Sequence, residues 1–169
     1  TCKWARDALT ALTDAIFDSD EKAIKVARSH VHDLMCGDVD VQGLLLSRML
    51  RSEYKSMNLA HVALAERLRQ RNDTAQVGPG ERISYVFIEG EKNSKQCERV
   101  ETLEFVRENG LRIDYNQYWQ SQFKNPLDVI LGLFSSYPSA IYRDIIEKSE
   151  KKYKKDRDMQ GFLRLFKKR

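Results

Sequence analysis

Hydrophobic residues recur every three or four positions through the first third of the chain, which is the spacing of one face of a helix. The inward positions expected for a first helix are Trp4, Leu9, Leu12, Ile16 and Phe17. Ser19 and Asp20 can end this helix and cap the next, because short polar side chains accept hydrogen bonds from a first helical turn. The inward positions expected for the second helix are Ala23, Ala27, Val31, Leu34 and Met35. Gly37 is expected to end it in the left-handed conformation.

The middle of the chain combines one further helix with one strand. Residues 58–71 are amphipathic, and their expected inward positions are Leu59, Val62, Ala63, Ala65 and Leu68. A turn at Gly78-Pro79-Gly80 precedes Ile83–Ile88, whose β-branched and aromatic residues predict a strand. Periodicity does not decide the conformation of the run VDVQGLLLSRML, residues 39–50.

The second half again predicts helices. One is expected over 102–108 with a stop at Gly110, another after a cap at Asp114, and a third beginning near Pro126. The predicted fold class is therefore mainly α, an α+β domain with a small β element around residues 82–89. We expect one domain over 1–147 and a basic C-terminal tail over 148–169.

Composition narrows the class of protein. The chain has 169 residues, of which 41% are hydrophobic and 32% charged, with eight Gly and three Pro. These values exclude collagen-like and low-complexity chains and suffice for a sizeable core. No run approaches the roughly 18 apolar residues of a membrane span, so no membrane partner is expected. Cys2, Cys36 and Cys97 are too few for a disulfide framework, which predicts a reducing, intracellular compartment. The start at Thr1 leads us to expect a piece of a longer polypeptide.

Positive charge is concentrated in two places. Residues 48–71 hold six Lys and Arg against two Asp and Glu, and residues 148–169 hold ten against three, although the net charge is only +4. Concentrated positive charge attracts phosphate backbones or an acidic protein face. On charge alone, a solvated helix face explains the internal block equally well.

Candidate catalytic and metal sites are weak. The chain lacks phosphate-binding glycine loops, a nucleophile elbow and a carboxylate pair at the end of a predicted strand. We therefore predict no catalytic residue within it. His30, His32 and Cys36 form the one candidate metal cluster. His32 and Cys36 are four residues apart and His30 points elsewhere, so surface histidines beside a small hydrophobic thiol explain the pattern better, and no metal site is predicted.

Four segments occur in the order found in a known family. They are GDVDVQGLLLSRMLRSEY at 37–54, HVALAERLRQR at 61–71, VGPGERISYVFIEG at 77–90 and IDYNQYWQSQFKNPLDVIL at 113–131. The third is the most specific, with a glycine turn, a charged residue and then Ile-x-Tyr-Val. Together the segments resemble the thumb, the C-terminal region, of family B DNA polymerases.

The resemblance implies a role in holding primer–template duplex DNA during replication, through contacts with phosphates instead of base edges. Lys55, Arg67 and Arg71 are the leading candidates, and the full set expected to bind DNA is Arg48, Lys55, Ser56, His61, Arg67, Arg71, Lys92 and Lys95. Lys55 and Ser56 lie in a short connection before a helix, where side chain and backbone can meet a phosphate together.

The resemblance also implies what lies outside this chain. The family's Tyr-Gly-Asp-Thr-Asp palm motif, finger lysines and exonuclease carboxylates are absent, so the rest of a polymerase chain is expected as a partner. Mg²⁺ is expected in that palm, and no cofactor in this fragment. The cysteine-rich modules of cellular eukaryotic replicases are also absent, which favours a viral, phage or archaeal enzyme. The expected location is the nucleus or a viral replication compartment.

The chain end carries a second resemblance. Gln160, Leu163 and Phe166 have the spacing of the clamp-binding peptide Q-x-x-aliphatic-x-x-aromatic-aromatic, which implies a processivity factor as partner. Lys167 departs from that pattern at the second aromatic position. Alternatively, the apolar residues near the end pack the last helix onto the domain.

Two other functions compete with a polymerase thumb. A non-enzymatic helical adaptor would dock an acidic protein through the basic tail, and a self-contained nuclease would cleave DNA with a metal. Steep salt dependence of duplex binding would separate a thumb from an adaptor. Metal-dependent cleavage by the fragment alone would identify a nuclease.

Overall fold

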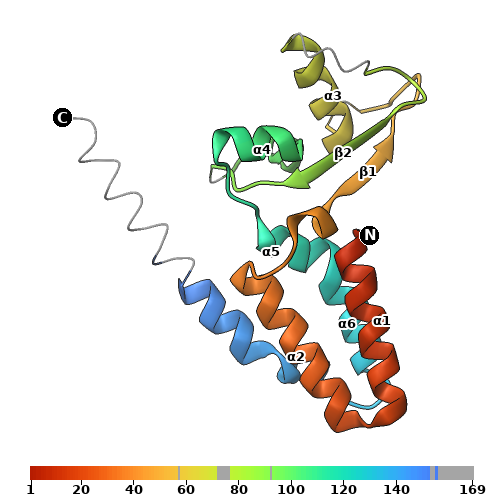
Figure 1. The fold of residues 1–169 in the computed structure, drawn as a ribbon, viewed down its shortest axis with the longest axis vertical. Coiled ribbons are helices and arrows are strands. Elements are labelled where there is room, and N and C mark those ends of the chain that lie inside the picture. Colours follow the sequence, from red (N-terminus) through yellow and green to blue (C-terminus); the bar gives the residue numbers. More distant parts are fainter. Residues whose placement is uncertain (57, 72–76, 92, 153–154, 156–169) are drawn as a thin grey trace, which may run out of the picture. The chain divides into compact units, whose positions relative to one another are not determined.

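The computed structural model describes residues 1–56, 58–71, 77–91, 93–152 and 155 (Figure 1). The chain forms two compact units. The first contains Thr1–Arg6 and Asp40–Tyr118, and the second contains Asp7–Val39 and Trp119–Arg169. Most of the described elements are helices, accompanied by a three-stranded antiparallel sheet in the first unit. The predicted α+β class is thereby confirmed.

The first unit is built on the sheet, whose strand order is β1-β2-β3. The strands are β1 (Leu46–Met49), β2 (Arg82–Phe87) and β3 (Val100–Glu101). Ser47 lies opposite Ser84 in the first pair, and Val86 lies opposite Glu101 in the second. Helices α3 (Ala60–Gln70) and α4 (Leu103–Asn109) both pack against β2. Short elements complete the unit: η1 (Val41–Leu44), η2 (Gln96–Glu98) and α5 (Tyr115–Tyr118).

Strand β2 forms where the β-branched and aromatic run predicts it, and it carries the core of this unit. Ile83 and Tyr85 are buried on one face, and Val86 and Phe87 are also buried. The hydroxyl of Tyr118 accepts a hydrogen bond from the Phe87 N–H at 3.0 Å. The undecided run 39–50 divides into the 3₁₀ turn η1 followed by β1.

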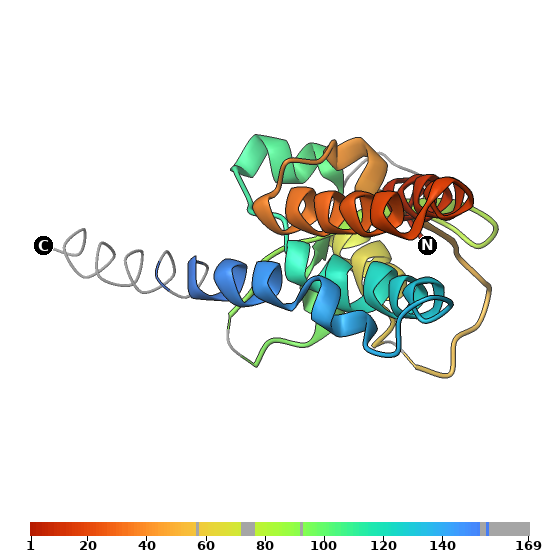
Figure 2. The ribbon, with the colours of Figure 1, turned by 90° about the horizontal axis from the view of Figure 1, so that it is seen from below.

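The second unit is helical throughout its described elements. It contains most of α1 (Lys3–Asp18), then α2 (Asp20–Cys36), the π-helical turn η3 (Trp119–Phe123), α6 (Lys124–Leu131) and η4 (Pro138–Ile141). Residues 143–152 are also helical and run alongside α2 (Figure 2). Trp119 anchors the core, with its ring edge-on to Tyr142 at a centroid distance of 4.9 Å. Phe123, Leu127 and Leu131 are fully buried beside it.

The predicted helix ends are confirmed. The Ser19 hydroxyl accepts a hydrogen bond from Lys22 N at 3.2 Å, and Gly37 ends α2 with φ of 76°. Gly110 ends α4 with φ of 59°. The Asp114 carboxylate accepts from Gln117 N at 2.9 Å, as expected of a cap.

Several predicted inward positions are wrong. Phe17 is 84% exposed, and α1 instead buries the small residues Ala5, Ala8 and Ala15 together with Leu12. A helix face lined by alanine lets neighbouring backbones approach closely, so the largest side chains need not mark the buried face. Leu59 is 42% exposed, and Leu64 takes the core position expected for Ala63.

The cysteines form no disulfide in the described part of the chain. Cys2 and Cys97 are buried thiols, and Cys36 is exposed. Among the described residues, no helix combines the length and apolar character that crossing a membrane requires.

Candidate nucleic-acid interface

Hydrogen bonds hold the backbone where the chain leaves β1. Leu50 donates its N–H to the Glu81 carbonyl and accepts from Gly80 N, each at 2.8 Å. The Tyr54 side chain folds back on this segment: its hydroxyl accepts from Arg51 N at 2.7 Å and donates to the Met49 carbonyl at 3.3 Å. These contacts hold the backbone of residues 49–51 in place.

His61 lies at the start of α3, against Tyr54. Its Nε2 is 3.2 Å from the Tyr54 hydroxyl, and the two rings meet edge-on. Either group can be the donor of this hydrogen bond, depending on the His61 tautomer. Burial lowers the pKa of His61, and the nearby charges of Arg48 and Arg51 lower it further. The ring is therefore neutral at pH 7.

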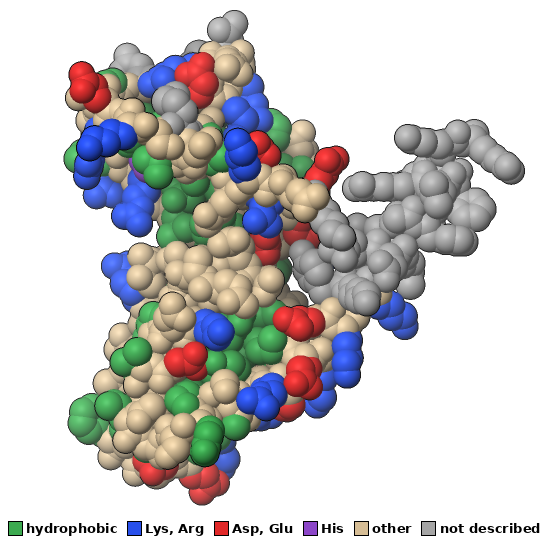
Figure 3. Space-filling model, turned by 180° about the vertical axis from the view of Figure 1, so that it is seen from behind, with side chains coloured by type: hydrophobic (Ala, Val, Ile, Leu, Met, Phe, Trp, Pro, Cys, Tyr) green, Lys and Arg blue, Asp and Glu red, His purple; other side chains and the backbone are tan. Residues whose placement is uncertain are grey.

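Arg48, Arg51 and Lys55 are exposed around the Tyr54–His61 pair, and we call these three residues the cationic cluster. Arg48 also hydrogen-bonds the side chain of Tyr85, whose pKa burial raises. Among the described residues, no ion pair joins the cationic cluster to an acidic side chain. In Figure 3, Lys and Arg side chains gather beside a histidine on the upper part of the molecule.

One exposed hydroxyl, that of Ser56, follows Lys55 directly in the chain. Ser56 is exposed, and its Oγ accepts from Asn58 N at 3.2 Å. Ser47 and Ser84 are exposed opposite each other on β1 and β2, and Arg82 Nη1 lies 3.4 Å from Ser47 Oγ. Side chains alternate along a strand, so Ser47 and Ser84 lie on the face of the sheet opposite to that of Arg48 and Ile83. Arg51 was not among the residues expected to bind DNA, although its place in the basic block 48–71 was a signal for it.

Arg67 and Arg71, two of the leading candidates, bind inside the first unit. Arg71 makes two parallel hydrogen bonds to the Glu101 carboxylate, at 3.1 and 2.8 Å, and its guanidinium carbon lies 3.9 Å from the centre of the Phe105 ring. Arg67 donates to the Cys97 carbonyl at 3.1 Å and to the Val100 carbonyl, and its Nε lies 3.5 Å from Glu101. Both arginines thus attach α3 to β3, and this structural role already uses much of their donor capacity.

The remaining predicted residues lie elsewhere. Lys95 is exposed at the start of η2, where its N–H donates to Glu98 Oε2 at 3.1 Å. In the described part of the chain, no hydrogen bond or ion pair links it to the cationic cluster. Lys92 and the clamp-peptide residues Gln160, Leu163 and Phe166 lie outside the described residues.

The side chains considered as metal ligands, those of His30, His32 and Cys36, do not form a metal site among the described residues. His32 Nε2 lies 3.5 Å from Cys36 Sγ, with both side chains exposed, and burial lowers the pKa of the neighbouring His30. Among the described residues, no group of three or more His, Cys, Asp or Glu side chains could hold a metal ion.

The geometry of the cationic cluster suits a phosphate backbone. A guanidinium, an ammonium and hydroxyl groups can all meet phosphate oxygens, and none of these contacts depends on base identity. The neutral His61 adds a hydrogen-bonding ring that could gain a proton beside an anion.

Known proteins are similar to this chain in sequence and in fold. Residues 1–133 match the family described as DNA polymerase family B. The DNA polymerase delta catalytic subunit of Plasmodium falciparum is 31% identical over 120 residues, which cover 71% of this chain and 11% of that subunit. The corresponding subunit of Schizosaccharomyces pombe is 32% identical over 119 residues, 70% of this chain and 11% of the relative. The DNA polymerase of Pyramimonas orientalis virus is 28% identical over 115 residues, 66% of this chain and 10% of the relative.

A solved structure has a similar fold. The family B DNA polymerase of the hyperthermophilic archaeon Pyrobaculum calidifontis aligns with a TM-score of 0.60 at 22% identity, over 74% of this chain and 17% of that one. The chain thus spans only about a tenth of the length of the curated relatives that it matches. From the match over residues 1–133 we conclude that the chain belongs to DNA polymerase family B.

Proposed function

We propose that this chain is the thumb of a DNA-directed DNA polymerase, where it holds the primer–template duplex through sequence-independent phosphate contacts. The observation that carries the proposal is the cationic cluster, three exposed cations without an acidic partner in the described residues, in a member of a DNA polymerase family. A replicase must slide along any product, so contacts with phosphates serve it and base-edge contacts would hinder it.

Salt-dependent binding tests this function directly. The 169-residue chain is titrated against two labelled duplexes of unrelated sequence, and the dissociation constant is followed by fluorescence anisotropy over a range of salt concentrations. We expect equal affinity for both duplexes and steep weakening by salt. Arg48→Ala and Lys55→Ala should each reduce the slope of log K against log salt by about one unit.

Arg107→Ala is the matched control, since Arg107 is an exposed arginine of the same unit but lies on α4. It should leave the slope within the error of the wild-type value. If Arg48→Ala changed the preferred sequence and not the slope, the cluster would be reading bases and the proposal would be wrong.

His61 provides a second measurement of the same site. Arg48 and Arg51 hold its pKa down in the free chain, so phosphates that offset their charge should raise that pKa. A titration of the imidazole signals by NMR, with and without duplex, should show the increase. An unchanged His61 pKa at saturating duplex would locate the DNA elsewhere.

The chemistry of the whole polymerase belongs to residues outside this chain. We propose nucleotidyl transfer in a palm that uses Mg²⁺, to which this chain contributes grip and no catalytic group. The chain alone, with primed DNA, nucleotides and Mg²⁺, should extend and cleave nothing. Turnover lost through a point change within these 169 residues would refute this assignment.

The C-terminal partner also stays a proposal. Gln160, Leu163 and Phe166 would dock on a processivity factor, so deletion of residues 159–169 from the complete replicase should spare short extension and abolish long products made with the factor.

Location in the nucleus or a viral replication compartment stays a prediction. So does a viral, phage or archaeal origin, because delta subunits and a virus polymerase match at similar identity.

The alternative function is a non-enzymatic adaptor that binds an acidic protein through its basic tail. Helical residues 148–152 supply three lysines to such a surface. An adaptor would show little affinity for duplex DNA at moderate salt, so the same anisotropy titration separates the two functions.

A further inference from the structure

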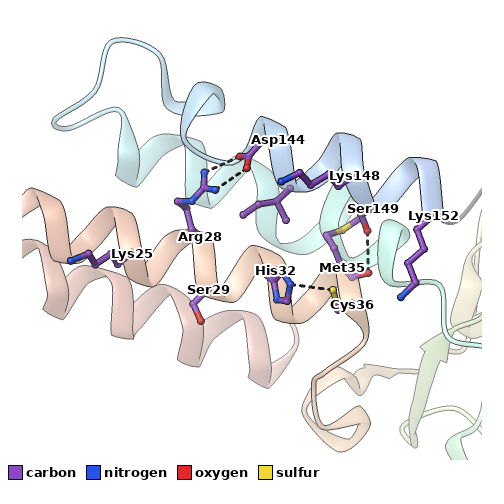
Figure 4. Close-up of a pocket in the computed structure, with 11 residues that line it drawn as sticks. Lys25, Arg28, Ser29, His32, Met35, Cys36, Asp144, Lys148, Ser149 and Lys152 are labelled. Carbon is purple, nitrogen blue, oxygen red and sulfur yellow. Dashed lines mark hydrogen bonds and ion pairs between the residues drawn. The ribbon is translucent and has the colours of Figure 1, made fainter.

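A groove in the second unit runs between α2 and helical residues 143–152 (Figure 4). Its volume is about 660 Å³, in the range of ligand sites. The residues that matter for its chemistry are Lys25, His32, Met35, Ile145, Lys148 and Lys152. None belongs to the cationic cluster, which lies in the first unit, so the groove is a separate candidate site.

The walls of the groove are fixed to each other. Arg28 on α2 makes two hydrogen bonds to the Asp144 carboxylate, each at 2.8 Å, and a further one to the Ile141 carbonyl. The Ser149 hydroxyl donates to the Met35 carbonyl at 3.2 Å. These contacts join the two helical segments at two points along the groove, so a ligand would meet a preformed surface and lose less affinity to ordering.

The lining leaves an excess of positive charge. Asp144 is held by Arg28, which lowers the pKa of that carboxyl and keeps it ionised. Lys25 pairs with Glu21 at 2.8 Å, but both side chains are more than 70% exposed, so the pair is weak. In the described part of the chain, no ion pair engages Lys152. Lys148 forms no ion pair there either, although its charge helps to lower the pKa of the Asp144 carboxyl. Their ammonium groups therefore create a field that attracts anions to the groove.

The groove also offers apolar surface from Met35 and Ile145. A duplex would place phosphates against an open cationic face and would gain nothing from this apolar surface, whereas a peptide can fill it with one hydrophobic side chain. Methionine adapts its shape to such a side chain. We infer that the groove binds an acidic peptide segment of another protein, with an apolar anchor against Met35 and Ile145 and carboxylates facing Lys148 and Lys152.

A synthetic peptide tests this inference. The probe is a labelled peptide in which a central Leu-Phe pair is flanked by Asp and Glu, and its binding to the 169-residue chain is measured by fluorescence anisotropy at about 150 mM salt. Lys148→Glu and Lys152→Glu should each weaken binding by about fivefold or more. Replacing Leu-Phe by Ser-Ser in the probe should weaken it about tenfold or more, and the Met35 methyl signal should shift with the intact probe only.

Lys151→Glu is the matched control, because Lys151 is exposed on the same helix and does not line the groove. It should change affinity by less than about twofold, and circular dichroism should show all three variants folded. An equal loss in Lys151→Glu would mean general attraction to a basic helix and would overturn the inference. So would the absence of saturable binding up to about 1 mM. A third result would also overturn the inference. If duplex DNA bound more tightly than the probe, and Lys148→Glu but not Lys151→Glu abolished that binding, the groove would be a nucleic-acid site.

Discussion

Replacing Glu101 by Gln removes the carboxylate that Arg67 and Arg71 share in the first unit. The Glu101 side chain is only 6% exposed and receives both guanidinium groups across the contact between α3 and β3. Glutamine keeps the volume and one acceptor oxygen but not the negative charge. Two cations would then remain in a partly buried place without their counter-charge, and their desolvation would no longer be offset.

The size of the effect follows from how buried each partner is. Breaking a buried pair by removing one partner costs about 3–5 kcal/mol. The side chains of Arg67 and Arg71 are 26% and 33% exposed, so water relieves part of the penalty. The ring of Phe105 beside Arg71 adds a favourable contact that survives the change. We therefore expect Glu101→Gln to lower the free energy of unfolding by about 2–3 kcal/mol.

Urea unfolding followed by circular dichroism measures this change. The control is Glu108→Gln, which removes the same charge from an exposed position at the end of α4 and should cost less than about 0.5 kcal/mol. If both variants unfolded at the same urea concentration, the ion pairs of Glu101 with Arg67 and Arg71 would not hold α3 to β3. Arg67 and Arg71 would then regain their place as leading candidates for DNA contact.

Three further predictions concern other positions. Gly37→Ala should destabilise the chain by about 1 kcal/mol in urea unfolding, because φ of 76° is costly for a residue with a Cβ. Leu12→Ala should cost about 2–5 kcal/mol and Phe17→Ala less than about 0.5 kcal/mol, since the former is fully buried and the latter is 84% exposed. His61 has its pKa lowered by burial and by Arg48 and Arg51, so its stabilising effect is complete above its unfolded pKa of about 6.5 and declines as pH falls below it. Urea unfolding at several pH values should show a flatter pH dependence for His61→Gln.

Local sequence was sufficient for the elements whose causes are local. The cap at Ser19 and the left-handed ends at Gly37 and Gly110 depend on a few neighbouring residues, and the structure has all three. Strand β2 was predictable because its β-branched and aromatic run is distinctive. Strand β1 was not, because a four-residue strand is determined by its pairing with β2, more than thirty residues away.

The candidate site also has one part that the sequence predicts and one part that it does not. Arg48 and Arg67 belong to one basic block, and their spacing contains nothing that distinguishes them. Arg67 is drawn inward by Glu101 and by two carbonyls near residue 100, whereas Arg48 has no such acid among the described residues. A single sequence cannot reveal which arginine meets a distant carboxylate, because that depends on how α3 lies on β3. The basic block was therefore predictable as a region, and its division into structural and exposed residues was not.

This division sets how strongly salt should weaken duplex binding. The block 48–71 contains six Lys and Arg. Arg67 and Arg71 bind Glu101, and Arg69 binds Glu66 and the Val77 carbonyl. Only the cationic cluster of Arg48, Arg51 and Lys55 then remains to displace counterions from DNA. Each phosphate contact contributes about −0.9 to the slope of log K against log salt, so the block should supply about −3, where six contacts would supply about −5. Replacing all three residues of the cationic cluster by alanine should therefore remove about 3 units of slope, whereas Arg69→Ala should remove none. A loss near zero in the triple variant, or a loss of about one unit in Arg69→Ala, would show that the ion pairs do not decide which cations meet the DNA.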